Sequence, residues 1–356
     1  MENILGLSCY GLHQSDKEDI LLERFQWLTE LHYQNCPAYR SVIDAYGGIK
    51  QYKCLEDIPP LAVHLFKTFE LASVERSELF KVLSSSGTSS QLTSKIYLDR
   101  STAYLQSKVL VKILQQYIGK QRMPMMIVDH SALIGNKNAF SARGAGVQGL
   151  SLFGRDHTYL LNQNMELDVD KLVAFCDQYG DQPVLLFGFT FMVWLYLLKV
   201  MEEKNIRVSL PKGILIHSGG WKKMLDEAVD NSFFKKMAHD RLGVTNVHNF
   251  YGMVEQTGSI FMECEEGVLH SSVFSDVLIR KSHDWSVCEV GEQGVIQVCS
   301  VIPTSYPGHN LLTEDIGMLL GIDDCPCGRK GKYFKVDGRI PQAELRGCSD
   351  TFEGTA

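Results

Sequence analysis

The stretch PVLLFGFTFMVWLYLL, Pro183 to Leu198, is the most apolar segment of the chain, and it decides the fold class. A membrane-spanning helix needs about 20 apolar residues, whereas this stretch is shorter and is interrupted by Gly188 and Thr190. Val184–Phe187 has the length and composition of a buried strand, and threonine commonly caps helix N-termini. The stretch therefore predicts a buried strand, a turn, and a helix that begins with Thr190 as its cap.

Strand-like and helical segments alternate on both sides of this stretch, from Lys81 to about Glu263. The other predicted strands are Met125–Val128, Gly213–Ile216 and Asn246–Phe250, and the predicted helices include Leu167–Tyr179 and Trp221–Ala228. This alternation is typical of an α/β protein in which helices cover a sheet.

The regions before and after this core differ from it in composition. The first part is mostly helical, as in Ile20–Tyr33, and ends in an extended element at Ile58 to Leu61. After Glu263, VLHSSVFSDVLIR and GEQGVIQVCSV predict paired strands joined near Gly291–Gly294. We expect a helical part at 1–82, an α/β core at 83–262, a β-rich subdomain at 263–336, and a hinge remnant with a short tail at 337–356.

The totals describe an ordinary globular chain of 356 residues, 45% of them apolar and 22% charged. A net charge of −7 argues against a surface for nucleic acid or anionic lipid. The N-terminus becomes polar and acidic too early for a signal peptide, so we expect no secretion and no membrane insertion. Ten cysteines without a secretory signal indicate a reducing compartment, and the expected location is the cytoplasm.

The stretch LSSSGTSSQLTSKIYLD, Leu83 to Asp99, has seven hydroxyl residues between Ser84 and Thr93. It lacks the Gly-Lys-Ser/Thr ending of a Walker P-loop, so a plain loop is one interpretation. The other is a phosphate loop, in which Gly87 permits a tight turn and hydroxyl and N–H groups bind phosphate oxygens. Lys95 would add a positive charge.

Two glycine turns each follow a strand-like run: HSGGWKKM at His217–Met224 and NFYGMVEQTGS at Asn249–Ser259. Such turns place side chains at the carboxyl edge of a sheet, where α/β proteins bind ligands. Gly219-Gly220 would let a flat ring approach the backbone, Tyr251 would stack on it, and Glu255 would hold Mg²⁺ beside phosphates. The alternative is two ordinary turns. A third glycine motif, GAGVQG, follows no buried strand and is not interpreted as a dinucleotide site.

Cysteine and histidine form two close pairs that are far apart in the chain. Cys264 and His270 are separated by five residues, and Cys325 and Cys327 by one. Zn²⁺ in structural sites takes four nitrogen or sulfur ligands in a tetrahedron, so a Cys₃His zinc site is one interpretation. Neither spacing is that of a standard zinc finger. The other interpretation is that the four residues are unrelated.

In this order, the motifs resemble those of the adenylate-forming enzymes (acyl-AMP ligases). SSSGTSS resembles their phosphate loop, HSGG their adenine-side turn, YGMVE their YGxTE motif, GEQGVIQV their GExGEIxV, LLTEDIG their TGD motif, and VDGRI their hinge. The chain is more closely similar to the LuxE-type acyl-protein synthetases of the bacterial luminescence fatty-acid reductase. That likeness includes NCPAYRSVID, IPPLAVHLFKTFEL, SARGAG, HSGGWKKM, YGMVEQTG and AELRGCSDT.

The resemblance implies the large N-terminal domain of an adenylate-forming enzyme, with layered α/β sheets and a small β-rich subdomain. It also implies a role for each matching residue. The residues are Ser85, Ser86, Gly87, Thr88 and Ser89 for the β/γ-phosphates of ATP; Gly219, Gly220 and Tyr251 for adenine; Glu255 for Mg²⁺; Asp315 for the ribose hydroxyls; and Arg339 at the hinge.

Two features depart from the family pattern. Val254 stands where a threonine usually contacts the α-phosphate, so Gln256 or Thr257 would have to replace that hydroxyl. Only 17 residues follow the hinge arginine, so we expect the family's C-terminal domain, with its catalytic lysine, to be essentially absent. Lys95, Lys222 or a partner would then neutralise the α-phosphate.

The resembled synthetases accept the acyl group on a cysteine near the C-terminus. Cys348, in the polar stretch RGCSDTFEGTA, matches that position, and Arg346 would lower the pKa of its thiol. A surface cysteine without a role is the alternative.

We expect the protein to be an ATP- and Mg²⁺-dependent acid–thiol ligase. It would activate a carboxylic acid as an acyl-adenylate, and the expected class of acid is a fatty acid. The acyl group would pass to a thiol, with Cys348 as the candidate, for delivery to an acyl reductase subunit. One alternative is a ligase that loads an acyl carrier protein or CoA, and another is a non-catalytic nucleotide-binding scaffold. Phe187–Phe189, Met192 and Trp194 would line an acyl pocket or, alternatively, form plain core.

Overall fold

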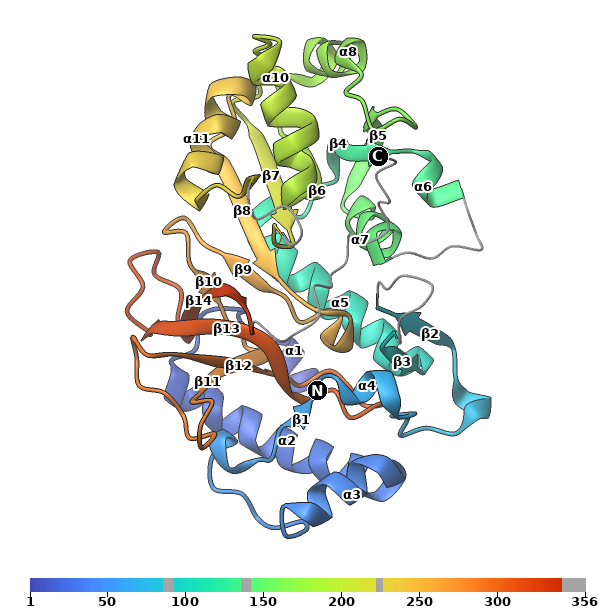
Figure 1. Cartoon of the computed structure of the whole chain (residues 1–356), viewed down its shortest axis with the longest axis vertical. Helices are drawn as coiled ribbons and strands as arrows, with labels where there is room; N and C mark the ends of the chain where they lie inside the picture. Colours follow the sequence, from blue (N-terminus) through green and yellow to red (C-terminus); the bar gives the residue numbers. More distant parts are fainter. Residues whose placement is uncertain (86–92, 136–141, 222–226, 341–356) are drawn as a thin grey trace. The chain divides into compact units, whose positions relative to one another are not determined.

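The computed structural model describes residues 1–85, 93–135, 142–221 and 227–340. These residues form two compact units (Figure 1). The first unit contains residues 1–85, 93–117 and 252–340, and the second contains 118–135, 142–221 and 227–251. The four-part division expected from composition stays a prediction, and most of its last part lies outside the described residues.

The second unit contains a parallel sheet in the strand order β8-β7-β6-β4-β5. Its strands are β4 (Met123–His130), β5 (Gly154–Leu161), β6 (Val184–Phe189), β7 (Gly213–Ser218) and β8 (Asn246–Tyr251). All residues of β6 are buried, which explains its unbroken apolar sequence, because helices flank both faces of parallel sheets. The four predicted strands in this unit are confirmed, and each is longer than its predicted range.

Helices connect the strands of the second unit. They are α6 (Ala132–Gly135), α7 (Ala142–Ser151), α8 (Val169–Tyr179), α9 (Thr190–Met192), the π-helix η3 (Val193–Leu198), α10 (Lys199–Glu203) and α11 (Asn231–Leu242). Asp168 caps α8 by accepting a hydrogen bond from the Lys171 amide. The predicted cap at Thr190 is wrong by one residue: Phe189 is the cap, and Thr190 is the first helical residue. Most of the helix predicted at 221–228 lies outside the described residues.

The first unit is built around an antiparallel sheet in the order β11-β12-β13-β14-β10-β9, with β1 added parallel to β13. Its strands are β1 (Leu61–Ala62), β9 (Phe261–Glu263), β10 (Leu269–His270), β11 (Ser275–Arg280), β12 (Gln293–Ser300), β13 (Asn310–Ile322) and β14 (Lys332–Arg339). A separate hairpin pairs β2 (Lys81–Ser84) with β3 (Lys95–Leu98). The predicted pairing after Glu263 is confirmed by β11 and β12, although their connection is longer than predicted.

The described helices of the first unit lie in the first 118 residues of the chain, apart from one 3₁₀ turn that follows β8. They are α1 (Glu2–Leu5), α2 (Gln14–Asn35), α3 (Pro37–Ala45), α4 (Leu65–Thr68), α5 (Arg100–Ile118) and the short 3₁₀ turns η1 (Leu55–Asp57), η2 (Arg76–Glu78) and η5 (Val254–Gln256). Helix α2 packs against the C-terminal part of the chain through a buried ion cluster. The Lys17 ammonium lies 3.3 Å from Asp276, and Lys332 lies 3.1 Å from the other oxygen of the same carboxylate.

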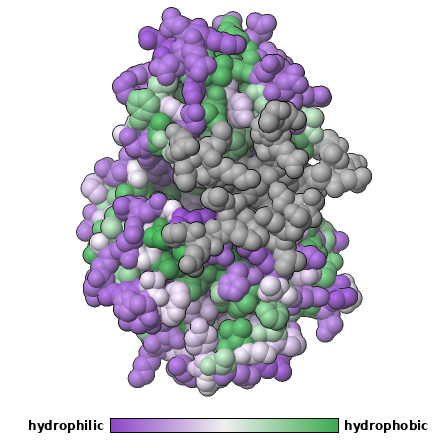
Figure 2. Space-filling view, in the orientation of Figure 1, coloured by the Kyte–Doolittle hydropathy of each residue, from purple (hydrophilic) through white to green (hydrophobic). Residues whose placement is uncertain are grey.

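On the face shown in Figure 2, apolar residues appear as patches between hydrophilic ones. Within the described residues, none of the helices combines the length and hydrophobicity that crossing a bilayer requires.

Candidate functional site

The adenine-side turn follows β7 at the carboxyl edge of the parallel sheet. Ser218 pairs in register with Phe250 of β8, so the register places Gly219 and Tyr251 at neighbouring strand ends. Gly219 has φ +86°, a left-handed conformation that favours glycine. A Cβ atom added at Gly220 would meet nothing within 4 Å, so there is open space beside that backbone.

The residue before the turn is held in place. The His217 ring lies 4.5 Å from the Phe234 ring, and its Nδ1 lies 2.9 Å from the Thr190 hydroxyl. Phe189 lies under the turn, 3.5 Å from where a Cβ of Gly219 would stand. The turn therefore rests on packed side chains, as a preorganised binding surface requires.

The serine loop is closed at its base in the first unit. The Ser85 amide donates to the Ser94 carbonyl at 3.0 Å, and the Ser94 amide donates to the Ser85 hydroxyl at 2.9 Å. Lys95 lies on β3 opposite Ser84, and its side chain is exposed. The loop residues Ser86, Gly87, Thr88 and Ser89 lie outside the described residues, as does Lys222.

Glu255 is a buried carboxylate on the turn η5, with 6% of its surface exposed. Burial raises the pKa of its carboxyl above the usual 4.5, against the opposing effects of a hydrogen bond from the Ser94 hydroxyl and the positive charges of Lys67 and Arg339. Ser94 therefore joins the base of the serine loop to this carboxylate. A buried carboxylate of this kind fits a divalent cation, because Mg²⁺ prefers oxygen ligands.

The turn that carries Glu255 is fixed by the buried loop before β13. The Tyr306 hydroxyl donates to the Glu255 carbonyl at 2.8 Å. The Gln256 amide donates to the carbonyls of Val298 at 3.0 Å and Gly308 at 2.8 Å. The side-chain amide of Gln256, one of two residues expected to replace the missing threonine hydroxyl, supports the turn, and its role toward the α-phosphate stays a prediction.

Strand register brings Asp315 and Arg339 together. They are paired residues of β13 and β14, and the Arg339 Nε donates to the Asp315 carboxylate at 3.2 Å. The neighbouring Glu314 lies 4.0 Å from the Lys67 ammonium. The sequence motifs assign no role to Lys67, although this residue lies in the stretch IPPLAVHLFKTFEL. Its contact with Glu314, far along the chain, distinguishes Lys67 from other lysines.

The cysteine–histidine cluster is defined as Cys264, His270, Cys325 and Cys327. Cys264 lies in the β9–β10 connection, His270 in β10, and both other cysteines in the β13–β14 connection. One ligand atom from each of the four residues lies within 4.8 Å of the others. The sulfur atoms of Cys264 and Cys325 are 3.9 Å apart, and the Cys327 sulfur is 3.4 Å from His270 Nε2. Tetrahedral zinc with ordinary bond lengths requires about 3.8 Å between sulfurs and about 3.6 Å between sulfur and nitrogen. The cluster therefore fits zinc.

The surroundings of the cluster also suit a metal site. The Tyr333 ring stacks on His270 at 5.5 Å, and burial lowers the pKa of His270 to about 4, so the imidazole is neutral and able to ligate. Burial acts to raise the pKa of the Cys327 thiol. Hydrogen bonds from the backbone and side chain of Arg329, and further ones from the thiols of Cys325 and Cys264, act in the opposite direction. Together they outweigh burial, so the pKa of Cys327 is lowered.

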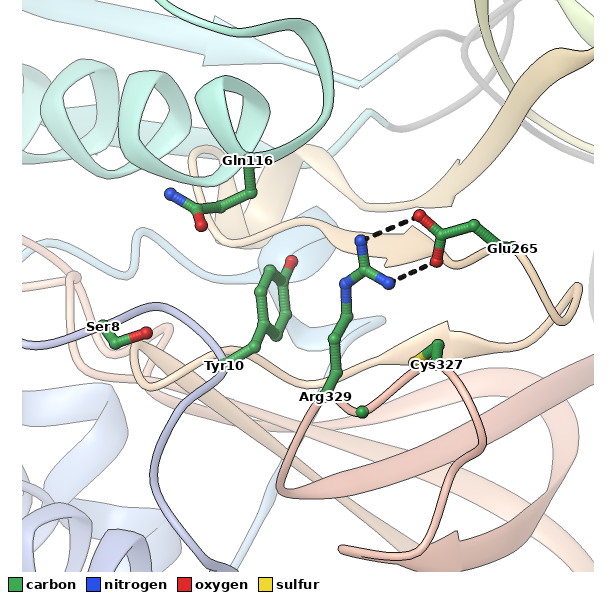
Figure 3. A pocket seen from close by; sticks show the side chains of 7 residues that line it. Ser8, Tyr10, Gln116, Glu265, Cys327 and Arg329 are labelled. Carbon is green, nitrogen blue, oxygen red and sulfur yellow. Dashed lines mark hydrogen bonds and ion pairs between the residues drawn. The ribbon is translucent and has the colours of Figure 1, made fainter.

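A polar pocket of about 530 Å³ lies beside the cluster (Figure 3). Arg329 spans it: its guanidinium pairs with Glu265, with one N–O distance of 3.2 Å, and lies 4.8 Å from the centre of the Tyr117 ring. Tyr10, from the N-terminal segment, lines the same pocket. The cluster is thus tied to α5 and the N-terminal segment through Arg329.

The sequence matches one protein family along nearly its whole length. The family described as acyl-protein synthetase, LuxE, matches residues 3–355. A curated relative, the long-chain-fatty-acid–luciferin-component ligase of Vibrio harveyi, is 21% identical over 335 residues, which cover 90% of this chain and 84% of that protein.

The fold is shared with solved acyl-CoA ligases. A 2-hydroxyisobutyryl-CoA ligase, solved in an open conformation with 2-HIB-AMP and CoA, has a TM-score of 0.69 at 16% identity and covers 94% of this chain and 77% of its own. ATP-bound MatB from Rhodopseudomonas palustris has a TM-score of 0.50 at 16% identity. The match covers 75% of this chain and 49% of the MatB chain. The α/β fold expected from the motifs is confirmed. The chain therefore belongs to the LuxE family of acyl-protein synthetases, and its fold is that of the adenylate-forming ligases.

Proposed function

We propose that this acid–thiol ligase activates a long-chain fatty acid with ATP and passes the acyl group to a cysteine thiol. The observation that carries the proposal is the family match over residues 3–355. The fatty acid is suggested by the Vibrio harveyi relative, whose name states that class of substrate. The buried Glu255 and the Asp315–Arg339 pair support nucleotide chemistry in this chain.

The chemistry explains why ATP is needed. A carboxylate resists nucleophiles because it is negatively charged and oxide is a poor leaving group. In the activation step, a carboxylate oxygen attacks the α-phosphorus of ATP, the bond to pyrophosphate breaks, and the acyl-adenylate forms. A thiolate then attacks the acyl carbon and AMP leaves. The protein contributes positioning and charge neutralisation, so no general-base dyad is required.

The residues of the first unit would act mainly on phosphates and ribose. Glu255 would hold Mg²⁺, which neutralises phosphate charge, and Asp315 would accept hydrogen bonds from the ribose hydroxyls. Ser85 to Ser89 would surround the β/γ-phosphates, Lys95 would add positive charge, and Arg339 would mark the hinge. The closed base at Ser85 and Ser94 supports this assignment, because it fixes both ends of the loop.

Gly219, Gly220 and Tyr251 would enclose the adenine ring. The open space beside Gly220 and the packed support beneath Gly219 suit a flat ring lying against the backbone.

The thiol that receives the acyl group is proposed to be Cys348, which lies outside the described residues. Delivery from there to an acyl reductase subunit follows the family resemblance. Loading of an acyl carrier protein or CoA is the competing assignment, and it predicts that Cys348→Ser leaves thioester formation on an external thiol intact.

The cysteine–histidine cluster is proposed to bind one structural Zn²⁺. Four ligands would fill the coordination shell, which leaves no open position for a substrate. Its role would be to join the β9–β10 and β13–β14 connections.

The decisive test is acid-dependent exchange of labelled pyrophosphate into ATP, measured with fatty, branched and aromatic acids. We expect exchange with long-chain fatty acids and an acyl adduct on Cys348 in the intact mass of the same sample. ATP binding without exchange for any acid would favour the scaffold alternative and overturn the proposal.

A further inference from the structure

We propose that Lys67 is a catalytic residue whose ammonium group contacts the phosphate oxygens of the nucleotide during acid activation. This inference rests on the proposed function and adds a cation to it that the motifs do not identify.

The backbone fixes Lys67 next to the strand that carries Asp315. The two-residue strand β1 pairs in parallel with β13, with Leu61 opposite Leu311 and Ala62 opposite Leu312. The Val63 amide then donates to the Leu312 carbonyl at 2.9 Å, and α4 begins two residues later. This short strand holds α4 beside the 313–315 segment.

A second anchor links Lys67 to Glu255. Phe66, the residue before it, is 1% exposed, and its ring lies edge-on to Tyr306 at 6.1 Å. Tyr306 is fully buried and donates its hydroxyl to the Glu255 carbonyl. One rigid side chain therefore supports both the lysine and the proposed magnesium ligand. The positive charge of Lys67 also acts to lower the pKa of the Glu255 carboxyl, against the larger effect of burial.

The environment of Lys67 suits a positive charge that acts on a ligand. Its side chain is 17% exposed, so water screens its charge only weakly, and its ion pair with Glu314 is long at 4.0 Å. The ammonium group of a lysine, on its long four-carbon stem, can reach a phosphate group, which carries more negative charge than a carboxylate.

The chemistry requires such a cation. As the carboxylate attacks the α-phosphorus, negative charge builds on the phosphate oxygens and on the leaving pyrophosphate. An ammonium group stabilises this charge without transferring a proton, so the lysine is unchanged at the end of the step.

The test compares four variants in pyrophosphate exchange: Lys67→Gln, Lys67→Arg, Glu314→Gln and the exposed-lysine control Lys53→Gln. We expect Lys67→Gln to lower kcat about 100-fold, as loss of a group that stabilises transition-state charge does. Lys67→Arg should retain more activity than Lys67→Gln, because the charge is kept. Glu314→Gln removes the ion pair but keeps the lysine, so it should stay within about threefold of wild type, as should Lys53→Gln.

A direct readout uses the two phosphorothioate isomers of ATP that carry sulfur at the α-phosphate. Wild type should prefer one isomer, and Lys67→Gln should lose much of that preference, whereas a merely structural lysine would leave it unchanged. Equal losses in Lys67→Gln and Glu314→Gln would assign the pair a structural role and overturn the inference, as would a fully active Lys67→Gln. Absence of exchange in the wild type would instead overturn the proposed function, and with it the role of Lys67.

Discussion

Replacing Cys325 with serine should release zinc from the cysteine–histidine cluster and loosen the first unit. The metal would join Cys264 to Cys325, which are 61 residues apart in the chain. A cross-link that closes a loop of this length restricts the unfolded chain, and the loop-entropy relation gives about 4 kcal/mol for its contribution to the free energy of unfolding. For a unit of this size, each kcal/mol corresponds to about 2–4 °C in Tm, so we expect a decrease of roughly 8–16 °C.

The measurements are metal content by mass spectrometry and thermal unfolding, on protein purified without chelator. Wild type should contain about one zinc per chain, and Cys325→Ser should contain much less. Cys54→Ser is the matched control, since that cysteine is exposed and belongs to the same unit. Wild-type protein that is free of metal and whose Tm does not change on addition of zinc would refute the reasoning.

Three further outcomes are expected around Glu255. Gly308→Ala should destabilise the protein by about 1–3 kcal/mol in urea unfolding and lower activity, because the new methyl group would meet the Tyr306 ring and lie 2.8 Å from the Glu255 carbonyl oxygen; unchanged stability would contradict the packing. Glu255→Gln should lower Mg²⁺-dependent exchange about 100-fold, yet unfold at a higher temperature than wild type at pH 8. The pKa of the carboxyl is raised in the fold, so its ionisation costs stability as the pH rises through that raised value, and the gain should vanish below pH 4.5. Asp315→Asn should raise the KM for ATP about tenfold with a smaller change in kcat, and an unchanged KM would remove Asp315 from the ribose site.

Sequence predicts those strands and helices whose structure is determined by the residues of a single segment. The run at Val184–Phe187 predicts its strand because a strand buried on both faces is continuously apolar. By contrast, β13 mixes glycines and carboxylates with apolar residues, and two register shifts against β14 interrupt its alternation. Its length of 13 residues follows from its neighbours on the sheet rather than from its own pattern.

The candidate site divides in the same way. Cysteine and histidine are few and their metal chemistry is restrictive, so the four residues could be grouped from sequence, and their ligand atoms do lie within 4.8 Å. Lys67 is one of many lysines, and its partner Glu314 lies far along the chain. Nothing local distinguishes a surface lysine from one that tertiary structure brings to a cluster of carboxylates.

The discontinuous first unit has a consequence for synthesis on the ribosome. Its early segments, 1–85 and 93–117, must wait for 252–340 before they can complete their sheet, and the core of the second unit, 118–251, is made in between. At about 5–20 residues per second, that interval is roughly 10–45 s. Until residue 276 has been made, Lys17 of α2 lacks its buried partner Asp276, and the apolar face of α2 has no complete sheet to pack against until the last strand is made. The nascent N-terminal third therefore exposes apolar surface during this interval, and the insertion between the halves of the first unit accounts for much of its length.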